Sequence, residues 1–429
     1  MTDNPREAAV CALCKIEKDG AYSNRAVLDE LYGMEPRDKA LANELIMGVL
    51  RNKIYIDFVI QTYSKIKLKK LSVWVLTILR CGVYQLTKMD KIPPSAACNE
   101  SVKLASRYAH KAARGYVNGV LRTVARNIES LPEPGGTSAE KMSVIYSCPL
   151  WLTEKLIAQF GEAVCESILI DSLEPHPAML RANILKTDAE ELSGLLLKEN
   201  IIASPDDEVQ QCLRVGGAID INKSKLYKDG YYTLQNINSM RAALILEPQS
   251  GETVIDVCAA PGGKTTHIAE LMGNKGRVIA FDIYKHKLEL IEKSARRLGI
   301  DCVEVRENNS EKTVEGLIGK ADRVLADVPC SGIGVIHKKP DIKFNRCEED
   351  IAVLCGIQRN ILNSAAEYVR PGGVLVYSTC TILKDENSGQ IERFLKEHND
   401  FEREFEKLYL AHETGGSGFY ICRMKKSAE

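Results

Sequence analysis

The pattern that most constrains the fold lies after Asn236, where short apolar runs alternate with helix-like stretches. Five of these runs are typical of buried strands, and they cover residues 253–259, 277–283, 302–308, 323–329 and 373–380. Strands that alternate with helices form right-handed crossovers, which produce a parallel sheet covered on both faces. Such sheets bind ligands at the carboxyl ends of their strands. The sequence therefore predicts a Rossmann-like α/β domain over residues 236–429.

Residues 1–130 show a different pattern, with apolar residues at helical spacing and few signs of strands. This region contains 21 Lys and Arg against 13 Asp and Glu, whereas the remainder contains 36 against 45. Its basic residues gather in two clusters, Lys65, Lys67, Lys69 and Lys70, then Arg107, Lys111, Arg114, Arg122 and Arg126. We therefore expect an all-α bundle that binds a polyanion, although such charges are also common on a solvated surface.

Between these two regions the composition indicates a linker and a third module. The segment LPEPGGTSAE at 131–140 is rich in Pro, Gly and Ser, as linkers are. Residues 141–235 then combine helical patterns with short apolar runs such as MLRANIL and CLRVGG. The prediction is a multi-domain chain with a small α+β module at 141–235.

Cysteine usage and hydropathy bear on the compartment. No stretch approaches the roughly 18 consecutive apolar residues that a membrane span needs. The start, MTDNPREAAV, has no basic and then apolar signal region, so we expect a cytoplasmic protein without a membrane partner, and its 14 cysteines reduced. Cys11 and Cys14 form a CxxC pair with no second pair at zinc spacing nearby, so we assign them to core packing and expect no metal.

A turn of small residues, DVCAAPGGKTTHIAELM at 256–272, ends the first buried run and opens a helix. Its GKT does not form a phosphate loop, because Cys258 stands where that motif has its first glycine, and Ala260 disfavours a dinucleotide fingerprint. Asp282 ends the second run, twenty residues after Gly262, where a carboxylate accepts hydrogen bonds from a ribose diol. These features favour S-adenosylmethionine as the cofactor, with a helix-capping Asp282 as the plainer alternative.

Two further runs carry cysteines at their ends, Cys330 in DVPCSG and Cys380 in STC. In a parallel sheet both thiols would lie at the edge where ligands bind. Two thiols beside a methyl-donor site are hard to explain by packing alone. They predict covalent catalysis.

These motifs carry a resemblance to a known family. DVCAAPGGKT, DVPCSGIGV and STCTILKDEN resemble the signatures of the RNA cytosine-C5 methyltransferases of the NOL1/NOP2/Sun family. The helical region, with RDKALANELIMGVLRNK and YVNGVLRTVARN, looks like a NusB-type RNA-binding domain. The resemblance covers nearly the whole chain. It implies a class I methyltransferase domain at 236–429, preceded by an RNA-recognition module at 141–235 and a NusB-like domain at 1–130.

The resemblance also implies roles for particular residues. Cys380 would be the nucleophile and Cys330 would assist release of the product. The cofactor pocket would be lined by Cys258, Ala259, Ala260, Pro261, Gly262, Gly263, Lys264, Asp282, Asn309 and Asp327. Asn309 stands where the family usually has an acidic residue near the adenine, and Asn236 stands where it often has Asp. The spacing alone leaves the two thiols exchangeable, because a Pro-Cys pair supplies the nucleophile in DNA cytosine methyltransferases.

The function implied is S-adenosylmethionine-dependent methylation of cytosine C5 in 16S rRNA, of the cytosine 967 type, on naked RNA or a partly assembled small subunit. We expect the enzyme to act as a monomer. Two alternatives remain. One is a methyltransferase that acts on tRNA, another RNA or DNA. The other is a non-catalytic RNA-binding, antitermination-like factor, which the presence of both Cys330 and Cys380 disfavours.

Overall fold

The computed structural model describes residues 4–19, 30–217 and 219–428, which form two compact units. The helical unit comprises residues up to Glu174 together with Ile336–Arg346, and the sheet unit comprises Pro175–Val335 and Cys347–Glu429. None of the helices described is long and apolar enough to cross a membrane.

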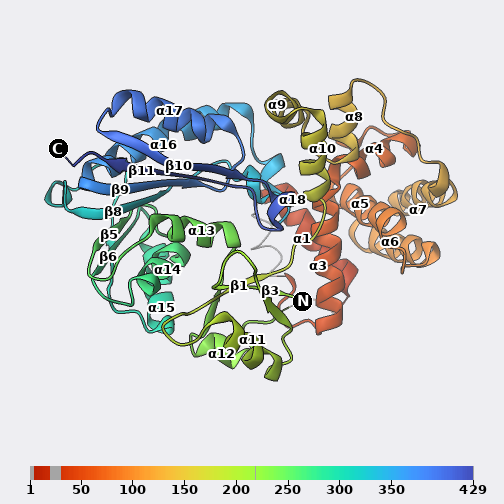
Figure 1. Ribbon diagram of the computed structural model, residues 1–429. Coiled ribbons are helices and arrows are strands. Elements are labelled where there is room, and N and C mark those ends of the chain that lie inside the picture. Colours follow the sequence, from red (N-terminus) through yellow and green to blue (C-terminus); the bar gives the residue numbers. More distant parts are fainter. Residues whose placement is uncertain (1–3, 20–29, 218, 429) are drawn as a thin grey trace. The chain divides into compact units, whose positions relative to one another are not determined.

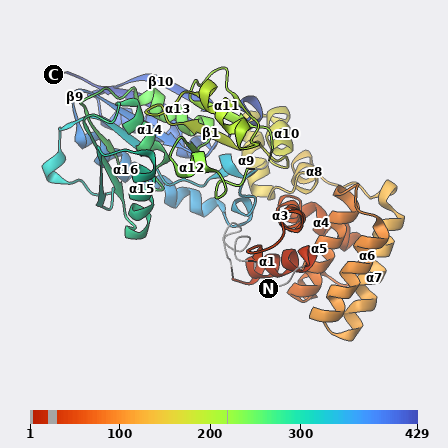
Figure 2. The same ribbon diagram turned by 90° about the horizontal axis from the view of Figure 1, so that it is seen from below.

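The helical unit begins with the expected all-α bundle. Its helices are α1 (Pro5–Asp19), α3 (Pro36–Arg51), α4 (Lys53–Tyr63), α5 (Val73–Lys88), α6 (Pro94–Tyr108) and α7 (Lys111–Arg126). Figure 2 shows α5, α6 and α7 side by side, and each pair of them is in contact. Leu45, Ile78, Val117 and Leu121 are fully buried in the common core, and Cys14 packs there as predicted.

Two other segments belong to the same unit. One contains three short helices, α8 (Ser138–Ile145), α9 (Leu150–Phe160) and α10 (Glu162–Asp171). The other is Ile336–Arg346, which holds the 3₁₀ turn η5 (Ile342–Phe344). Arg51 Nη2 donates to the His337 carbonyl at 3.1 Å, and Lys343 Nζ donates to the Arg51 carbonyl at 3.1 Å. The expected linker thus lies inside this unit, and the domain boundaries stay predictions.

The sheet unit opens with a four-stranded antiparallel sheet of order β2-β3-β1-β4, which confirms the small α+β module. The strands are β1 (Met179–Ala182), β2 (Ala203–Pro205), β3 (Cys212–Val215) and β4 (Tyr232–Leu234). Two helices belong to it, α11 (Ala189–Lys198) and α12 (Lys225–Lys228). Leu192 and Leu196 of α11 pack on Leu180 and Leu213 to form its core.

A seven-stranded sheet of order β10-β11-β9-β8-β5-β6-β7 forms the rest of this unit. Its five parallel strands match the five buried runs, and they are β5 (Thr253–Asp256), β6 (Arg277–Asp282), β7 (Val303–Glu307), β8 (Ala321–Asp327) and β9 (Val369–Thr379). The Rossmann-like prediction is confirmed.

One feature of this sheet was predicted wrongly, because it is mixed rather than parallel throughout. Strands β10 (Phe401–Tyr409) and β11 (Phe419–Lys426) form an antiparallel hairpin, and β11 also pairs antiparallel with β9. The sequence FEREFEKLY places charges along an edge strand, so it lacks the apolar run that marks the buried strands.

Helices cover both faces of the large sheet (Figure 1). On one face lie α13 (Ile237–Leu246), α14 (Gly263–Leu271) and α15 (Lys285–Leu298). On the other lie α16 (Glu348–Tyr368) and α17 (Ser388–Glu397), and a short helix, α18 (Ala411–Thr414), joins β10 to β11. This order places the carboxyl ends of β5, β8 and β9 next to one another.

Candidate active site

The turn between β5 and α14 forms the first wall of the site. Its backbone folds on itself, with Gly262 N donating to the Ala259 carbonyl at 2.8 Å. Gly262 has φ +101°, and a side chain there would press on the backbone of Ile291, whose Cα would lie 3.1 Å from an added Cβ. Only glycine suits this position. The turn therefore brings backbone close to a ligand and leaves the N–H groups at the start of α14 open to it.

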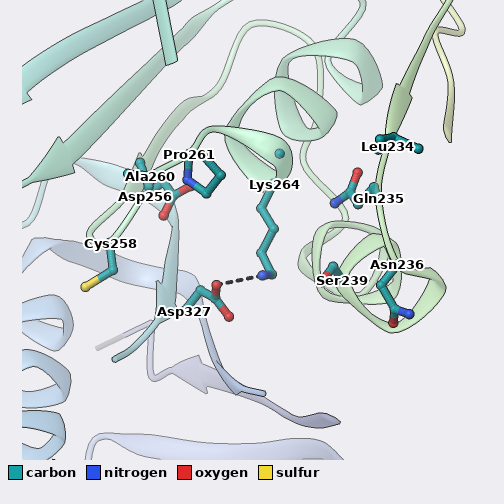
Figure 3. A pocket seen from close by; sticks show the side chains of 12 residues that line it. Leu234, Gln235, Asn236, Ser239, Asp256, Cys258, Ala260, Pro261, Lys264 and Asp327 are labelled. Carbon is teal, nitrogen blue, oxygen red and sulfur yellow. Dashed lines mark hydrogen bonds and ion pairs between the residues drawn. The ribbon is translucent and has the colours of Figure 1, made fainter. Parts of the chain in front are cut away.

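A cavity of about 220 Å³ opens in front of this turn (Figure 3). Seven of the ten expected cofactor residues line it, namely Cys258, Ala259, Ala260, Pro261, Gly263, Lys264 and, at the end of β8, Asp327. The remaining lining residues are Leu234, Gln235, Asn236, Ser239 and Asp256. The motif residues thus converge on one hollow at the carboxyl edge of the sheet.

Asp256 was not singled out from the sequence, although it begins the motif. It ends β5, is 1% exposed, and accepts a 2.7 Å hydrogen bond from Thr265 Oγ1. Burial raises the pKa of Asp256 to about 7. Cys258 is similarly affected, since burial raises the pKa of its thiol well above the usual value. The cavity wall therefore holds one carboxyl that titrates near neutrality and one thiol that stays protonated.

Lys264 and Asp327 form an ion pair across the cavity. Lys264 Nζ lies 2.6 Å from Asp327 Oδ2, and Ser378 Oγ donates to Asp327 Oδ1 at 2.7 Å. Figure 3 shows the Lys264 side chain reaching from α14 to the Asp327 carboxylate. Both oxygens of Asp327 are held, so its position is fixed by neighbours on α14 and β9.

The two predicted catalytic cysteines lie together. Cys330 Sγ is 3.2 Å from Cys380 Sγ, which is hydrogen-bond distance and longer than the ~2.05 Å of a disulfide. The hydrogen bond to Cys380 raises the pKa of the Cys330 thiol well above its usual value, and burial acts in the same direction. Burial and the contact with Cys380 therefore both favour the protonated form of Cys330.

A buried carboxylate that sequence reasoning missed holds the loop around Cys330. Glu386 is fully buried, and its Oε1 accepts hydrogen bonds from Ser331 N at 2.8 Å and Gln358 Nε2 at 2.9 Å. Ser331 Oγ donates to the other oxygen, and Gln358 Nε2 also donates to the Pro329 carbonyl at 3.0 Å. The signal lay in the motif STCTILKDEN, whose acidic end contains Glu386.

Asp282 and Asn309 lie at neighbouring strand ends, but neither they nor Gly262 line the cavity described above. Asp282 ends β6 and its Oδ1 accepts from Tyr284 N at 3.0 Å, so it caps the following turn. Asn309 follows β7, and its Oδ1 accepts from Glu311 N at 3.1 Å. Their contacts with a cofactor stay predictions.

Asn236, the other departure from the family pattern, caps helix α13. Its Oδ1 accepts from Asn238 N at 3.1 Å and from Ser417 N at 3.3 Å. Asn and Asp are equally good at this position of a helix. The substitution therefore keeps the local structure of the cavity wall.

In the helical unit, four of the five residues of the second basic cluster lie along one side of α7, while Arg107 lies on α6. Exposed Lys111, Arg114, Arg122 and Arg126 fall on one face at ~100° per residue. The opposite face is buried through Ala113, Val117, Val120, Leu121 and Val124. Such a stripe of cations is suited to a phosphate backbone.

Within the described ranges, no group of three or more His, Cys, Asp or Glu side chains is placed to hold a metal ion. The functional groups at the site are thiols, carboxyl groups and a lysine ammonium. A Rossmann-like domain with this turn and these paired thiols defines a methyltransferase.

Comparison with known proteins specifies the family. Residues 243–420 match the 16S rRNA methyltransferase RsmB/F family, residues 3–126 match the NusB family, and residues 148–222 match the ferredoxin-like domain of RsmF/B-like methyltransferases. The chain is 36% identical to the probable ribosomal RNA small subunit methyltransferase B of Bacillus subtilis, over 98% of each chain. It is 32% identical to ribosomal RNA small subunit methyltransferase B of Proteus mirabilis, over 99% of each.

The chain belongs to the ribosomal RNA small subunit methyltransferase B family. Among solved structures it resembles that of PH0851, with a TM-score of 0.84 and 27% identity over 99% of this chain and all of that one. The family membership confirms the resemblance drawn from the motifs, the three-part fold and S-adenosylmethionine as the methyl donor.

Proposed function

We propose that this protein methylates C5 of a cytosine in 16S rRNA, of the cytosine 967 type, through a covalent bond between Cys380 and C6 of the base. The observation that carries the proposal is the 3.2 Å separation of the sulfur atoms of Cys330 and Cys380, which follow the paired strand ends at Asp327 and Ser378. A single nucleophile would need no second thiol at this distance. Two thiols in contact suit a reaction in which one adds to the base and the other helps it leave.

The residues present fit the cofactor. The turn at 258–263 presents small side chains and backbone, and Gln235 at its edge has a buried Nε2 without a hydrogen-bond partner. An unpaired buried donor is costly, so an acceptor on a ligand is expected there. S-adenosylmethionine supplies the methyl group. The set of cofactor residues proposed is Cys258, Ala259, Ala260, Pro261, Gly262, Gly263, Lys264, Asp282, Asn309 and Asp327.

The protein's own residues make C5 reactive. Attack of the Cys380 thiolate on C6 forms a C–S bond and moves electron density onto C5, which is otherwise a poor nucleophile. Asp327 is proposed to hold the N3/N4 edge of the base, and Lys264 fixes the orientation of the Asp327 carboxylate. After methylation, a base accepts the C5 proton, the C5–H electrons restore the C5–C6 double bond, and the C6–S bond breaks so that Cys380 leaves as thiolate. Cys330 assists this elimination.

The substrate must present its base to this site. A cytosine inside a helix is out of reach, so the base is taken from a loop or flipped out of the stack. The cationic face of α7 and the antiparallel module are proposed to bind the surrounding RNA, either free or in a partly assembled small subunit. We propose that one monomer is sufficient, since all the proposed catalytic residues lie on one chain.

Bisulfite sequencing tests the proposed product, because 5-methylcytosine resists deamination. Unmethylated 16S rRNA incubated with the protein and S-adenosylmethionine should gain one resistant cytosine, and Cys380→Ala should give none. The same reaction with total tRNA is the comparison. If resistant cytosines appear only in tRNA, the substrate is tRNA and not 16S rRNA. If methyl groups are incorporated without any resistant cytosine, the C5 assignment is overturned.

A further inference from the structure

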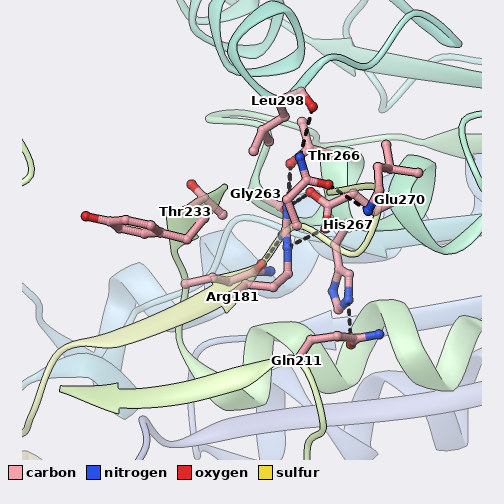
Figure 4. A network of polar contacts seen from close by, with 12 residues as sticks. Arg181, Gln211, Thr233, Gly263, Thr266, His267, Glu270 and Leu298 are labelled. Atoms are coloured by element: carbon pink, nitrogen blue, oxygen red, sulfur yellow. Dashed lines mark hydrogen bonds and ion pairs between the residues drawn. The ribbon is translucent and has the colours of Figure 1, made fainter. Parts of the chain in front are cut away.

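The fully buried side chain of Arg181 joins the small antiparallel module to the cavity (Figure 4). Arg181 lies on β1 and forms a bidentate ion pair with Glu270 of α14, with Nη2 to Oε1 at 2.7 Å and Nε to Oε2 at 3.1 Å. It also donates to Thr266 Oγ1 at 3.1 Å. One guanidinium therefore fixes the helix that starts at the cofactor turn.

The same guanidinium reaches two residues of the cavity wall. Arg181 Nη1 donates to the Gly263 carbonyl at 2.6 Å and to Gln235 Oε1. Gly263 and Gln235 both line the cavity. Arg181 itself is not among the lining residues, so any effect it has on a ligand must pass through these two.

The bond to Arg181 determines which way the Gln235 amide faces. If the amide were flipped, its NH₂ group would meet an arginine N–H, and two donors would oppose each other. Oε1 must therefore face Arg181, which leaves Nε2 on the cavity side, as Figure 3 shows. Gln235 is 8% exposed and its Nε2 has no partner, so this donor is buried, oriented and unsatisfied.

The chemistry around this donor indicates what it binds. Gly263, the first residue of α14, lies next to the Gln235 amide, and the N–H groups at the start of that helix favour a negatively charged acceptor there. The charge of Lys264 on the same wall is paired with Asp327, so the helix start and the Gln235 donor carry this preference. Within the proposed function, the cofactor carries such a group in the carboxylate of its amino-acid end. A base carbonyl would be the competing acceptor.

We propose that Arg181 is a positioning residue that holds Gln235 so that Nε2 donates to the carboxylate of the cofactor. This inference rests on the proposed function, because it requires S-adenosylmethionine in this cavity. It also assigns the antiparallel module a part in forming the cofactor site, since Arg181 belongs to that module.

Calorimetric titration tests the proposal with two ligands, S-adenosylmethionine and its decarboxylated analogue. Gln235→Leu and Arg181→Lys should each weaken the binding of S-adenosylmethionine by about tenfold and leave the affinity for the decarboxylated analogue nearly unchanged. Lysine keeps a charge near Glu270 but lacks the planar fork that reaches Gln235. A role confined to stability would not change the ratio of the two affinities.

Further variants address folding and specificity. Arg181→Met combined with Glu270→Gln avoids leaving a buried carboxylate unpaired. This double variant should show the same decrease in the ratio of the affinity for S-adenosylmethionine to that for the analogue. Arg297→Met is the matched control, because Arg297 links α15 to the same module through the Tyr227 and Tyr232 carbonyls, at 2.7 and 2.9 Å. It should keep the ratio of the unsubstituted protein.

The outcomes separate this inference from the proposed function. If the unsubstituted protein binds neither ligand, the proposed cofactor site fails. If it prefers S-adenosylmethionine and the Arg181 and Gln235 variants keep that preference, the inference is overturned while the site stands. A rise in the KM for RNA with unchanged cofactor affinity would also overturn it, and would assign Gln235 to the base.

Discussion

The sulfur atoms of Cys330 and Cys380 lie 3.2 Å apart although 50 residues separate them in the sequence. Cys330 follows β8 and Cys380 follows β9, and these strands are parallel neighbours. The short distance is therefore set by the sheet, while the buried Glu386 holds the loop that carries Cys330. A pair of thiols placed in this way is the central element of the proposed reaction.

Asp282→Ala should weaken binding of S-adenosylmethionine by about 1 to 3 kcal/mol, because the ribose hydroxyls would lose a charged acceptor. Calorimetric titration measures the change. Asp301→Ala, at an exposed aspartate before β7, is the matched control and should bind normally. Equal affinities for the two variants would show that Asp282 does not contact the cofactor and serves only to accept the hydrogen bond from Tyr284 N.

The affinity for the cofactor should depend on pH through Asp256. Its folded pKa is about 7, so the carboxylate forms as the pH rises through neutrality and then attracts the cationic cofactor. Titrations on either side of pH 7 should show tighter binding at the higher pH, and Asp256→Asn should remove that dependence. An unaltered pH profile in the variant would exclude Asp256 as its origin.

Burial of Lys343 should make stability depend on pH in the alkaline range. Burial lowers its folded pKa from 10.5 to about 8, so between these values this side chain binds more protons in the unfolded chain, and its contribution to stability rises with pH. Urea unfolding across this range should show that the free energy of unfolding of the unsubstituted protein, measured relative to that of Lys343→Met, increases with pH. An identical slope in both proteins would contradict this assignment.

Replacing the basic face of α7 should weaken RNA binding and reduce its salt dependence. Glutamine at Lys111, Arg114, Arg122 and Arg126 removes cations that would release counterions from phosphates. The slope of log K against log salt should therefore fall by roughly one for each phosphate that is no longer neutralised. Lys396→Gln on α17 is the control. If the slope does not change, these side chains form only a solvated surface.

Much of this architecture follows from local sequence. The buried runs at 253–259 and 323–329 marked β5 and β8, and the small-residue turn ending at Gly262 marked the start of α14. Strand β10 could not be recognised in this way, because the charged residues of FEREFEKLY resemble a solvated segment. Nothing local in Ile336–Arg346 indicates that it belongs to the helical unit, since its anchor, Arg51, is far away in the sequence.

The residues of the site likewise divide into those that local sequence identifies and those that it does not. The motif cysteines and the turn residues could be identified because they carry chemistry at short spacing. Arg181 could not, because its side-chain partners all lie more than 50 residues away, with Gln235 at 54. Glu386 lies inside a recognised motif, but its role depends on Ser331 and Gln358, which are 55 and 28 residues away. A buried polar residue is recognised by what it contacts, and only the folded chain provides that information.

The most direct test of the covalent mechanism is a denaturing gel of the protein after incubation with 16S rRNA and S-adenosylmethionine. Cys330→Ala should accumulate a protein–RNA adduct, because addition precedes elimination and the later step is the one removed. Cys380→Ala should form no adduct and incorporate no methyl group, and Cys347→Ser, at an exposed cysteine, should turn over without accumulation. An adduct with Cys380→Ala but not with Cys330→Ala would reverse the two roles, and no adduct with either would contradict the covalent mechanism.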